Sequence, residues 1–312
     1  MIIDDVFKKF VEVRKYKVKQ STIDLYTNLY NRHFSFLKGM EIESLTSNIV
    51  DDWLTYMRIN KNSPQRLSFD HELTLLKTIV SFYHEQYDVR LDIFKKRHME
   101  NCVVKRRLQK LNKELREDEF KLFIEWLRLL YNEKFTMLAI IQYYQALRIS
   151  EAIAIHYNDI KLDPQNPLNS SLTIQRSVVF SHQSNQKSYI QNGFKNGDVK
   201  RQPLIPQVYF YLKDKLEQFK GKYLFIEDGI WPFYSIKNAY NKAFMRANLP
   251  YRSTHILRHG GCSRLFNMSG GNVIIASQLL GNSEKETLKT YAHGYSGTLQ
   301  YFTNSLYLQN EK

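Results

Sequence analysis

The sequence has 312 residues, enough for two domains, and its 43% hydrophobic content excludes an intrinsically disordered chain. The net charge of +14 at pH 7 indicates a polyanionic partner, because basic side chains that meet phosphates release condensed counterions. No apolar run is long enough to span a membrane, and the N-terminus carries acids where a signal peptide would be basic. We therefore expect a cytoplasmic protein with nucleic acid as its partner and no membrane contact.

The two cysteines, Cys102 and Cys262, are far apart and form no Cys-x-x-Cys motif. A disulfide framework or a zinc–thiolate site is therefore disfavoured. We expect two buried or idle thiols in a reducing compartment.

The first hundred residues predict helices and no strands. Apolar residues at helical spacing indicate three helices, at about 21–34, 49–57 and 63–83. Thr46–Ser47 is a capping signal for the second helix, and Ser63–Pro64 places a proline in the first turn of the third. The pattern predicts a helical domain of four or five short helices.

A strongly basic segment follows at about 95–112 and holds a single acid, Glu100. Such a run is commonly a solvated face, but in a chain this basic a linker along a DNA backbone is equally expected. The cations of this segment that we expect to contact DNA are Lys105, Arg106, Arg107 and Lys110. We place the domain boundary near residue 112, which gives domains at 1–112 and 113–312.

The second part of the chain predicts a mixed domain, so the fold class is mainly α with a small antiparallel β-sheet. Helices are indicated at about 117–130, 133–145 and 149–156. Alternating β-branched residues predict a strand at 171–179, followed by strands at 187–194 and 201–205. After Pro206 we expect helices, broken at Pro232, Gly260–Gly261 and Gly270–Gly271.

Two short basic motifs of this domain suit phosphate chemistry. Arg148 stands where two helices meet, and Glu151 one turn later can orient its guanidinium toward a phosphate, although such a pair is more often a surface ion pair. Lys195 stands in a Gly197-containing turn between strands. A lysine at a hairpin tip can reach a reacting oxygen and, if desolvated, release a proton, but exposure alone explains many such lysines.

A third motif places two histidines and an arginine on one helix face. His255, Arg258 and His259 are three or four residues apart, and Thr254 would cap the helix so that its N-terminal N–H groups favour an anion. The histidine spacing also suits zinc, but Ile256 stands where a metalloprotease helix has Glu, and no third ligand is evident. A packed histidine pair without a role remains open.

These motifs, taken in order with a final Tyr291, resemble the tyrosine recombinase (phage integrase) family. The resemblance covers about 113–295, and the preceding helical part is similar to the family's SAM-like core-binding domain. The motifs that carry it are Ala146-Leu147-Arg148-Ile149-Ser150-Glu151, the hairpin lysine Lys195, His255-Ile256-Leu257-Arg258-His259, Leu279-Leu280-Gly281-Asn282-Ser283 and Thr287-Leu288-Lys289-Thr290-Tyr291-Ala292-His293.

The resemblance implies a role for each matching residue. Arg148, Arg258 and His255 would bind the scissile phosphate, and Tyr291 would attack it. Lys195 would protonate the leaving 5′-oxygen, with Lys200 as the fallback for that role. The remaining expectations are that Glu151 and His259 support the site, that Asn282 donates a hydrogen bond, and that Lys200 and Arg201 contact DNA.

Two departures from the family pattern stand out. Asn282 replaces the usual His or Trp, so it can donate a hydrogen bond but cannot exchange a proton near neutral pH. The pair Gln145-Ala146 replaces the usual Thr-Gly, which we interpret as a structural change.

The resemblance also implies what the chain would do and with which partners. It would be a site-specific recombinase that cleaves and rejoins double-stranded DNA core sites through a 3′-phosphotyrosyl bond, without metal, ATP or another cofactor. It would act as a dimer on each site and as a tetramer in synapsis, associated with the nucleoid. The apolar stripe of the tail at 294–312 would dock on its own domain or on a neighbouring protomer. Topoisomerase IB-like relaxation and a catalytically idle DNA-binding protein remain alternatives.

Overall fold

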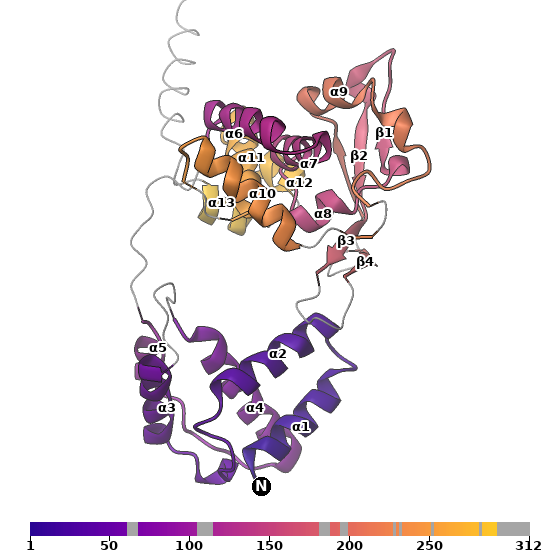
Figure 1. The fold of residues 1–312 in the computed structure, drawn as a ribbon. Coiled ribbons are helices and arrows are strands. Elements are labelled where there is room, and N and C mark those ends of the chain that lie inside the picture. Colours follow the sequence, from indigo (N-terminus) through magenta and orange to yellow (C-terminus); the bar gives the residue numbers. More distant parts are fainter. Residues whose placement is uncertain are drawn as a thin grey trace, which may run out of the picture. The chain divides into compact units, whose positions relative to one another are not determined.

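The computed structural model describes residues 1–60, 68–104, 115–180, 188–193, 199–226, 229–230, 233–250, 253–280 and 283–291. In the last segment the side chains of 286 and 289–291 are outside the description. The chain divides into two compact units, Met1–Lys110 and Leu111–Lys312 (Figure 1). The expected boundary near residue 112 lies outside the described residues, as do Lys105, Arg106, Arg107, Lys110 and the tail at 294–312.

The described part of the first unit is a bundle of five α-helices around an apolar core. These are α1 (Ile3–Arg14), α2 (Gln20–His33), α3 (Ser47–Asn60), α4 (Asp70–Tyr87) and α5 (Lys96–Asn101), with a 3-10 turn at Ile42–Ser44. Trp53 is fully buried and its indole N–H donates to the carbonyl of His33 at 2.9 Å, which fixes α3 against the end of α2. The helical bundle expected from the sequence is confirmed.

The starts of α3 and α4 test two sequence signals. The Thr46 hydroxyl accepts the N–H of Ile49 at 3.3 Å, so the predicted cap of α3 is confirmed. The third predicted helix is confirmed as α4, but its predicted start near Ser63–Pro64 is wrong. Residues 61–67 lie outside the description, but Ser68 pairs with Val103 in an isolated antiparallel bridge, and α4 begins only at Asp70.

The second unit combines eight described α-helices with two small antiparallel sheets. The helices are α6 (Glu117–Leu130), α7 (Glu133–Tyr144), α8 (Ile149–Ile153), α9 (Pro206–Leu212), α10 (Phe233–Arg246), α11 (His255–Met268), α12 (Val273–Leu280) and α13 (Glu284–Tyr291). Short 3-10 turns occur at Tyr157–Asp159, Pro167–Asn169 and Leu216–Phe219. The mainly α fold with a small antiparallel β component is confirmed. Among the described residues no helix is both long and apolar enough to cross a bilayer.

The strand predicted at 171–179 is in fact two strands that belong to different sheets. One sheet has the order β1-β2-β5, and the other pairs β3 with β4; the strands are β1 (Ile160–Lys161), β2 (Ser171–Ile174), β3 (Arg176–Val179), β4 (Tyr189–Asn192) and β5 (Lys200–Pro203). The break falls at Gln175, because the buried carboxylate of Asp159 binds the Gln175 amide and the Arg176 guanidinium, each at 2.6 Å. The expectation of one sheet is therefore wrong.

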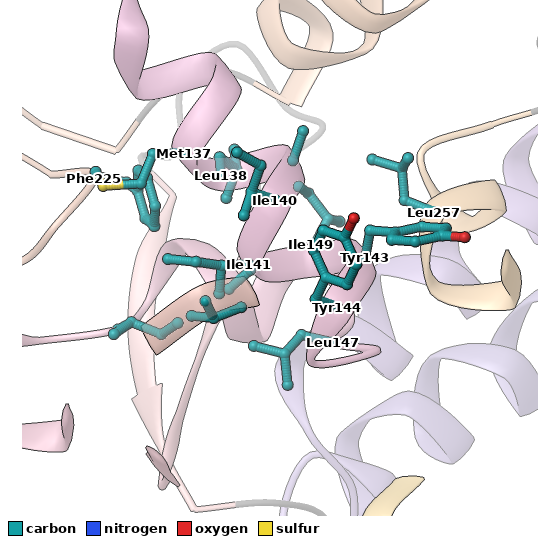
Figure 2. Packing of buried hydrophobic residues seen from close by; sticks show 14 of the residues in the cluster. Met137, Leu138, Ile140, Ile141, Tyr143, Tyr144, Leu147, Ile149, Phe225 and Leu257 are labelled. Atoms are coloured by element: carbon teal, nitrogen blue, oxygen red, sulfur yellow. The ribbon is translucent and has the colours of Figure 1, made fainter. Parts of the chain in front are cut away.

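Helix α7 forms the centre of the second unit. Every residue from Thr136 to Tyr144 is buried, and Figure 2 shows its apolar side chains packed with Ile149, Phe225 and Leu257 from other segments. A helix that is apolar all round is expected only where neighbours cover every face. The C-terminal end of this fixed helix leads directly into Arg148.

The two glycine pairs behave differently. Gly270 and Gly271 have φ values of 65° and 78°, and they end α11 as predicted. The break predicted at Gly260–Gly261 is wrong, since α11 runs through both. A Cβ on Gly261 would lie 2.0 Å from the carbonyl oxygen of Tyr143. These glycines serve the close approach of α11 to α7.

Candidate functional site

The site begins at the tight turn between α7 and α8. The N–H of Leu147 donates to the carbonyl of Gln142 at 3.0 Å, and the N–H of Ala146 donates to that of Tyr143 at 3.1 Å. These two bonds form a Schellman motif, in which Ala146 takes the left-handed position with φ of 52°. The turn sets Arg148 as the residue that precedes α8.

Glu151 is the acidic centre of the site. Its carboxylate accepts the backbone N–H of Arg148 at 2.8 Å and the Nη1 of the same residue at 2.8 Å. The Glu151 side chain is only 6% exposed, whereas that of Arg148 is 43% exposed. Glu151 therefore caps α8 and holds one nitrogen of the Arg148 guanidinium. The remaining N–H donors of that guanidinium can face solvent or a ligand.

Arg258 joins the same carboxylate from α11, 107 residues along the chain from Glu151. Its Nη1 donates to the Ala146 carbonyl at 3.1 Å and lies 3.5 Å from Glu151 Oε2. Its Nη2 donates to the Leu280 carbonyl at 3.3 Å, and its side chain is 7% exposed. Arg258 reaches the turn because Gly261, on the next turn of α11, lets the two backbones approach closely.

Lys200 is the third cation of the site. It is the first residue of β5, and its Nζ donates to the carbonyl of Leu279 near the end of α12. Burial lowers its pKa to about 8, Arg258 and Arg148 contribute to the lowering, and Glu151 opposes it. Arg148 and Arg258 thus contact one buried carboxylate, which also acts electrostatically on Lys200. We call these four residues the Glu151 cluster.

Gln145 places β5 beside this cluster. Its side-chain amide donates to the Pro203 carbonyl at 3.1 Å and accepts the N–H of Ile205 at 2.7 Å. Its backbone carbonyl accepts from the Gln202 amide at 3.3 Å. From the sequence, Gln145 was interpreted as a structural departure from the family pattern. The hydrogen-bond partners of its side-chain amide were not predictable from the sequence.

His255 lies at the start of α11, beside the cluster. Burial lowers its pKa, Arg258 and Arg148 lower it further, and Glu151 opposes them, so its surroundings favour the neutral imidazole. Its ring centroid is 6.3 Å from that of His259, as expected for neighbours one turn apart. Thr254 precedes the helix without a side-chain cap bond. Instead, the Ser253 hydroxyl accepts the backbone N–H of His255 at 3.2 Å.

Helices α12 and α13 lead from the cluster toward the expected nucleophile. They pack on each other and on α11, and Thr287 of α13 is fully buried. Tyr291 is the last residue of α13, but its side chain is outside the description. Lys195 and Asn282 also lie outside the described residues. Arg201 is exposed and donates to the Ser171 hydroxyl at 3.1 Å.

The geometry gives the site a clear chemical character. Three cationic groups gather around one carboxylate, so the cluster carries excess positive charge at neutral pH and favours an anion such as a phosphate. The described residues hold no group of three or more His, Cys, Asp or Glu side chains placed to bind a metal ion. Both cysteines are buried thiols.

The whole chain resembles several solved structures in fold. No protein-family model and no curated protein matches the sequence. The Tn1549 transposon integrase, in complex with a circular intermediate DNA, superposes with a TM-score of 0.75 at 17% identity, covering 98% of this chain and 99% of that one.

Two further structures show the same architecture. A lambda integrase tetramer bound to a Holliday junction gives a TM-score of 0.64 at 13% identity over 91% of this chain and 78% of that one. The XerH site-specific recombinase, bound to a palindromic difH substrate, gives 0.60 at 16% identity over 95% and 83%. The chain therefore has the fold that these integrases and recombinases share.

Proposed function

We propose that this chain is a tyrosine recombinase, which cleaves and rejoins DNA at specific sites through a covalent bond between Tyr291 and a 3′-phosphate. The observation that carries the proposal is the Glu151 cluster. Two guanidinium groups contact one buried carboxylate, and the charge of that carboxylate also acts on a desolvated ammonium group from a third segment, in a chain with the fold of these recombinases. Arg148, which is half-exposed, is placed to meet an incoming phosphate.

The proposed chemistry is phosphoryl transfer by charge neutralisation. Arg148 and Arg258 would bind the non-bridging oxygens of the scissile phosphate, where negative charge develops in the transition state. His255 would donate one hydrogen bond to the same phosphate. Glu151 and His259 would orient these groups, and Asn282 would donate a further hydrogen bond.

The bonds and protons of DNA cleavage and rejoining can be accounted for without a metal ion or ATP. The Tyr291 oxygen forms a bond to phosphorus as its proton passes to water, while the bond from phosphorus to the 5′-oxygen breaks. Nearby cations favour the phenolate, since a free tyrosine has a pKa of about 10. Lys195, or Lys200 as the fallback, donates a proton to the leaving 5′-oxygen. A 5′-hydroxyl of another strand then attacks the phosphotyrosine and gives its proton to the same lysine. The bond from phosphorus to Tyr291 breaks, and the released phenolate takes a proton from water.

The proposed partner is double-stranded DNA bound by both units. The first unit, with the basic segment at about 95–112, would act as the core-binding domain, and the second, at about 113–312, as the catalytic domain. Exposed cations such as Arg201, together with the basic segment, would contact the backbone. The net charge of +14 supports this. We also propose dimers on each site and tetramers in synapsis, which the lambda integrase tetramer on a Holliday junction supports by analogy.

Trapping of a covalent intermediate tests the proposal. Duplexes that the protein binds are selected from a randomised pool, and nicked versions are prepared so that the released 5′-end diffuses away. We expect a protein–DNA adduct with the wild type and none with Tyr291→Phe. We expect about 10²- to 10³-fold slower adduct formation with Arg148→Ala, because a transition-state charge contact is lost. An undiminished adduct from Tyr291→Phe, or none from the wild type, contradicts the proposal.

Strand exchange separates the recombinase from its alternatives. Two differently labelled duplexes carrying the selected site are incubated with the protein, and a supercoiled plasmid is incubated in parallel. We expect recombinant duplexes. Plasmid relaxation without exchange would favour a topoisomerase IB-like activity, and DNA binding without either reaction would favour a catalytically idle DNA-binding protein.

A further inference from the structure

The C-terminal end of α12 is held by two cations from other elements. Lys200 of β5 donates its Nζ to the Leu279 carbonyl, and Arg258 of α11 donates its Nη2 to the Leu280 carbonyl at 3.3 Å. The last carbonyls of a helix lack partners within the helix and carry partial negative charge, so cations there are favourable. Helix α13 begins at Glu284, four residues after α12 ends.

Lys200 stabilises this end of α12, but burying its charged ammonium group lowers the stability of the folded chain. Its ammonium is largely removed from water, and it faces Arg148 before α8 and Arg258 on α11, which disfavour its charge. Glu151 on α8 and Cys262 on α11 partly offset this. An apolar side chain of similar length would fill the same space without the desolvation penalty. A charged group held at such a cost in a candidate site points to function.

A continuous path of contacts links Lys200 to both halves of the site. On one side Gln145, which immediately precedes the Ala146 turn and Arg148, binds Pro203 and Ile205 and so fixes β5. On the other side Lys200 holds α12, and α12 packs on α13. Thr287 is fully buried, so it anchors α13 on the helices against which it packs.

We propose that Lys200 is a positioning residue, which fixes the end of α12 and thereby sets where α13 presents Tyr291 relative to the Arg148–Arg258 phosphate cradle. The inference rests on the proposed function and assigns Lys200 a role other than proton donation. Lys195 then keeps the role of proton donor. A nucleophile misplaced by about 1 Å can cost on the order of a hundredfold in rate.

The leaving group of the substrate distinguishes positioning from proton donation. Single-turnover cleavage is measured on the selected duplex and on the same duplex with sulfur in place of the bridging 5′-oxygen, because a thiolate leaves without needing a proton. We expect Lys200→Met to slow cleavage of both substrates by about a hundredfold. Lys195→Met should slow only the oxygen substrate. Full rescue of Lys200→Met by the sulfur substrate would overturn the positioning role.

Two matched variants complete the comparison. Lys200→Arg retains a cation able to reach the Leu279 carbonyl, so we expect it to restore most of the cleavage rate. Lys161→Met removes an exposed lysine of β1 in the same sheet and should leave the rate unchanged. A wild-type rate in Lys200→Met, or an equal loss in Lys161→Met, would also overturn the inference.

A structural readout keeps the inference separate from the proposed function. Hydrogen exchange of peptides covering 279–291 is compared in wild type and Lys200→Met without DNA. We expect faster exchange there in the variant and unchanged exchange in α10. If the wild type forms no DNA adduct but this difference appears, the proposed function fails while the positioning contact stands. Unchanged exchange at 279–291 would contradict the contact itself.

The pH dependence provides a third signature. Lys200 loses its charge as the pH rises through about 8, and a neutral amine makes a weaker hydrogen bond to the Leu279 carbonyl. The ratio of the Lys200→Arg rate to the wild-type rate should therefore increase between about pH 7 and 9.5, because arginine stays charged. On the sulfur substrate this increase should persist, and its disappearance there would reassign Lys200 to proton transfer.

Discussion

The two units each contain a carboxylate surrounded by donors, and the two arrangements differ in charge. In the first unit, Asp51 accepts from Arg97 at 2.7 Å and from Asn101 at 2.9 Å, and lies 3.5 Å from the His98 ring. We call these four residues the Asp51 cluster. In the second unit, the Glu151 carboxylate faces two guanidinium groups and an ammonium group.

The difference indicates what each cluster does. The Asp51 cluster pairs one carboxylate with one guanidinium, and Arg97 is 48% exposed, so water screens it. Its contacts join α5 to α3 and need no further ligand. The Glu151 cluster has more cations than its carboxylate can neutralise, at a place where Glu151 and Arg258 are nearly inaccessible to water. A balanced cluster serves the fold, whereas an excess of buried positive charge suits an anionic ligand.

The largest expected effect comes from forcing α11 away from the Glu151 cluster. Gly261→Ala would place a Cβ 2.0 Å from the Tyr143 carbonyl oxygen, so α11 must move and carry Arg258 with it. We expect the second unit to lose at least about 3 kcal/mol of unfolding free energy, and DNA cleavage to be lost. Hydrogen exchange of peptides from each unit during denaturant unfolding measures the effect.

Gly39→Ala in the first unit is the matched control. Gly39 has φ of 78°, and a Cβ there would meet nothing within 4 Å. Only the left-handed backbone opposes the change, so we expect a loss of about 1 kcal/mol in the first unit. Equal losses from the two glycine variants would show that the approach of α11 to α7 is not close enough to matter.

Neutralising the two carboxylates compares the clusters directly. Glu151→Gln leaves Arg258 buried without its counter-charge, and we expect a loss of about 3–5 kcal/mol in the second unit. Asp51→Asn leaves Arg97 half-exposed, and we expect a loss of about 1 kcal/mol or less in the first unit. Denaturant unfolding followed by unit-specific hydrogen exchange checks both. A larger loss from Asp51→Asn would reverse the ranking of the clusters.

Helix positions were largely predictable from the sequence, because local spacing and caps determine them. The ranges expected at 117–130 and 133–145 agree with α6 and α7 to within a residue at each end, and Thr46 caps α3. The break of the strand at Gln175 was not predictable, since it depends on Asp159, a buried carboxylate 16 residues earlier. The helix break predicted at Gly260–Gly261 was wrong, because a glycine pair is equally compatible with the end of a helix and with a close contact between two helices.

The site shows the same division. The order of the motifs led to Arg148, Glu151, His255 and Arg258, and the structure brings these four residues together. The sequence left the role of Lys200 open between proton donation and DNA contact. Its burial depends on how Gln145 docks β5, through hydrogen bonds that span about 60 residues. Local sequence does not encode such tertiary contacts.

The stability of both units should rise with pH, but in different pH ranges, because Asp51 and Lys200 both have a lowered pKa in the folded state. Burial opposes the shift, but hydrogen bonds from Arg97 and Asn101 hold the pKa of Asp51 below its ordinary value. The ionised Asp51 carboxylate therefore stabilises the first unit fully above its unfolded pKa, near 3.9. This stabilisation is lost as the pH falls through the lower folded pKa. We expect acid to narrow the stability difference between the wild type and Asp51→Asn.

Lys200 should give a rise in stability with pH in the basic range. Its folded pKa of about 8 lies below the unfolded value near 10.4, so between these values the unfolded chain binds more protons. The stability of the wild type relative to Lys200→Met should therefore rise as the pH increases through this window. Unfolding of the second unit at several pH values from 7 to 10.5 checks this, and a flat difference would mean that the ammonium is not desolvated.

The smallest expected effect is selective protection by inorganic phosphate. An anion that binds only the folded state stabilises it by about 1.4 kcal/mol at ten times its dissociation constant. Because the Glu151 cluster has excess cations and the Asp51 cluster does not, phosphate should slow hydrogen exchange around 146–151 and 279–280 and leave 47–51 and 97–102 unchanged. Chloride at equal ionic strength controls for screening, and Arg148→Gln should weaken the protection. Equal protection of both regions would mean that phosphate acts on the chain as a whole, and the contrast between a balanced and an unbalanced cluster would then have no bearing on ligand binding.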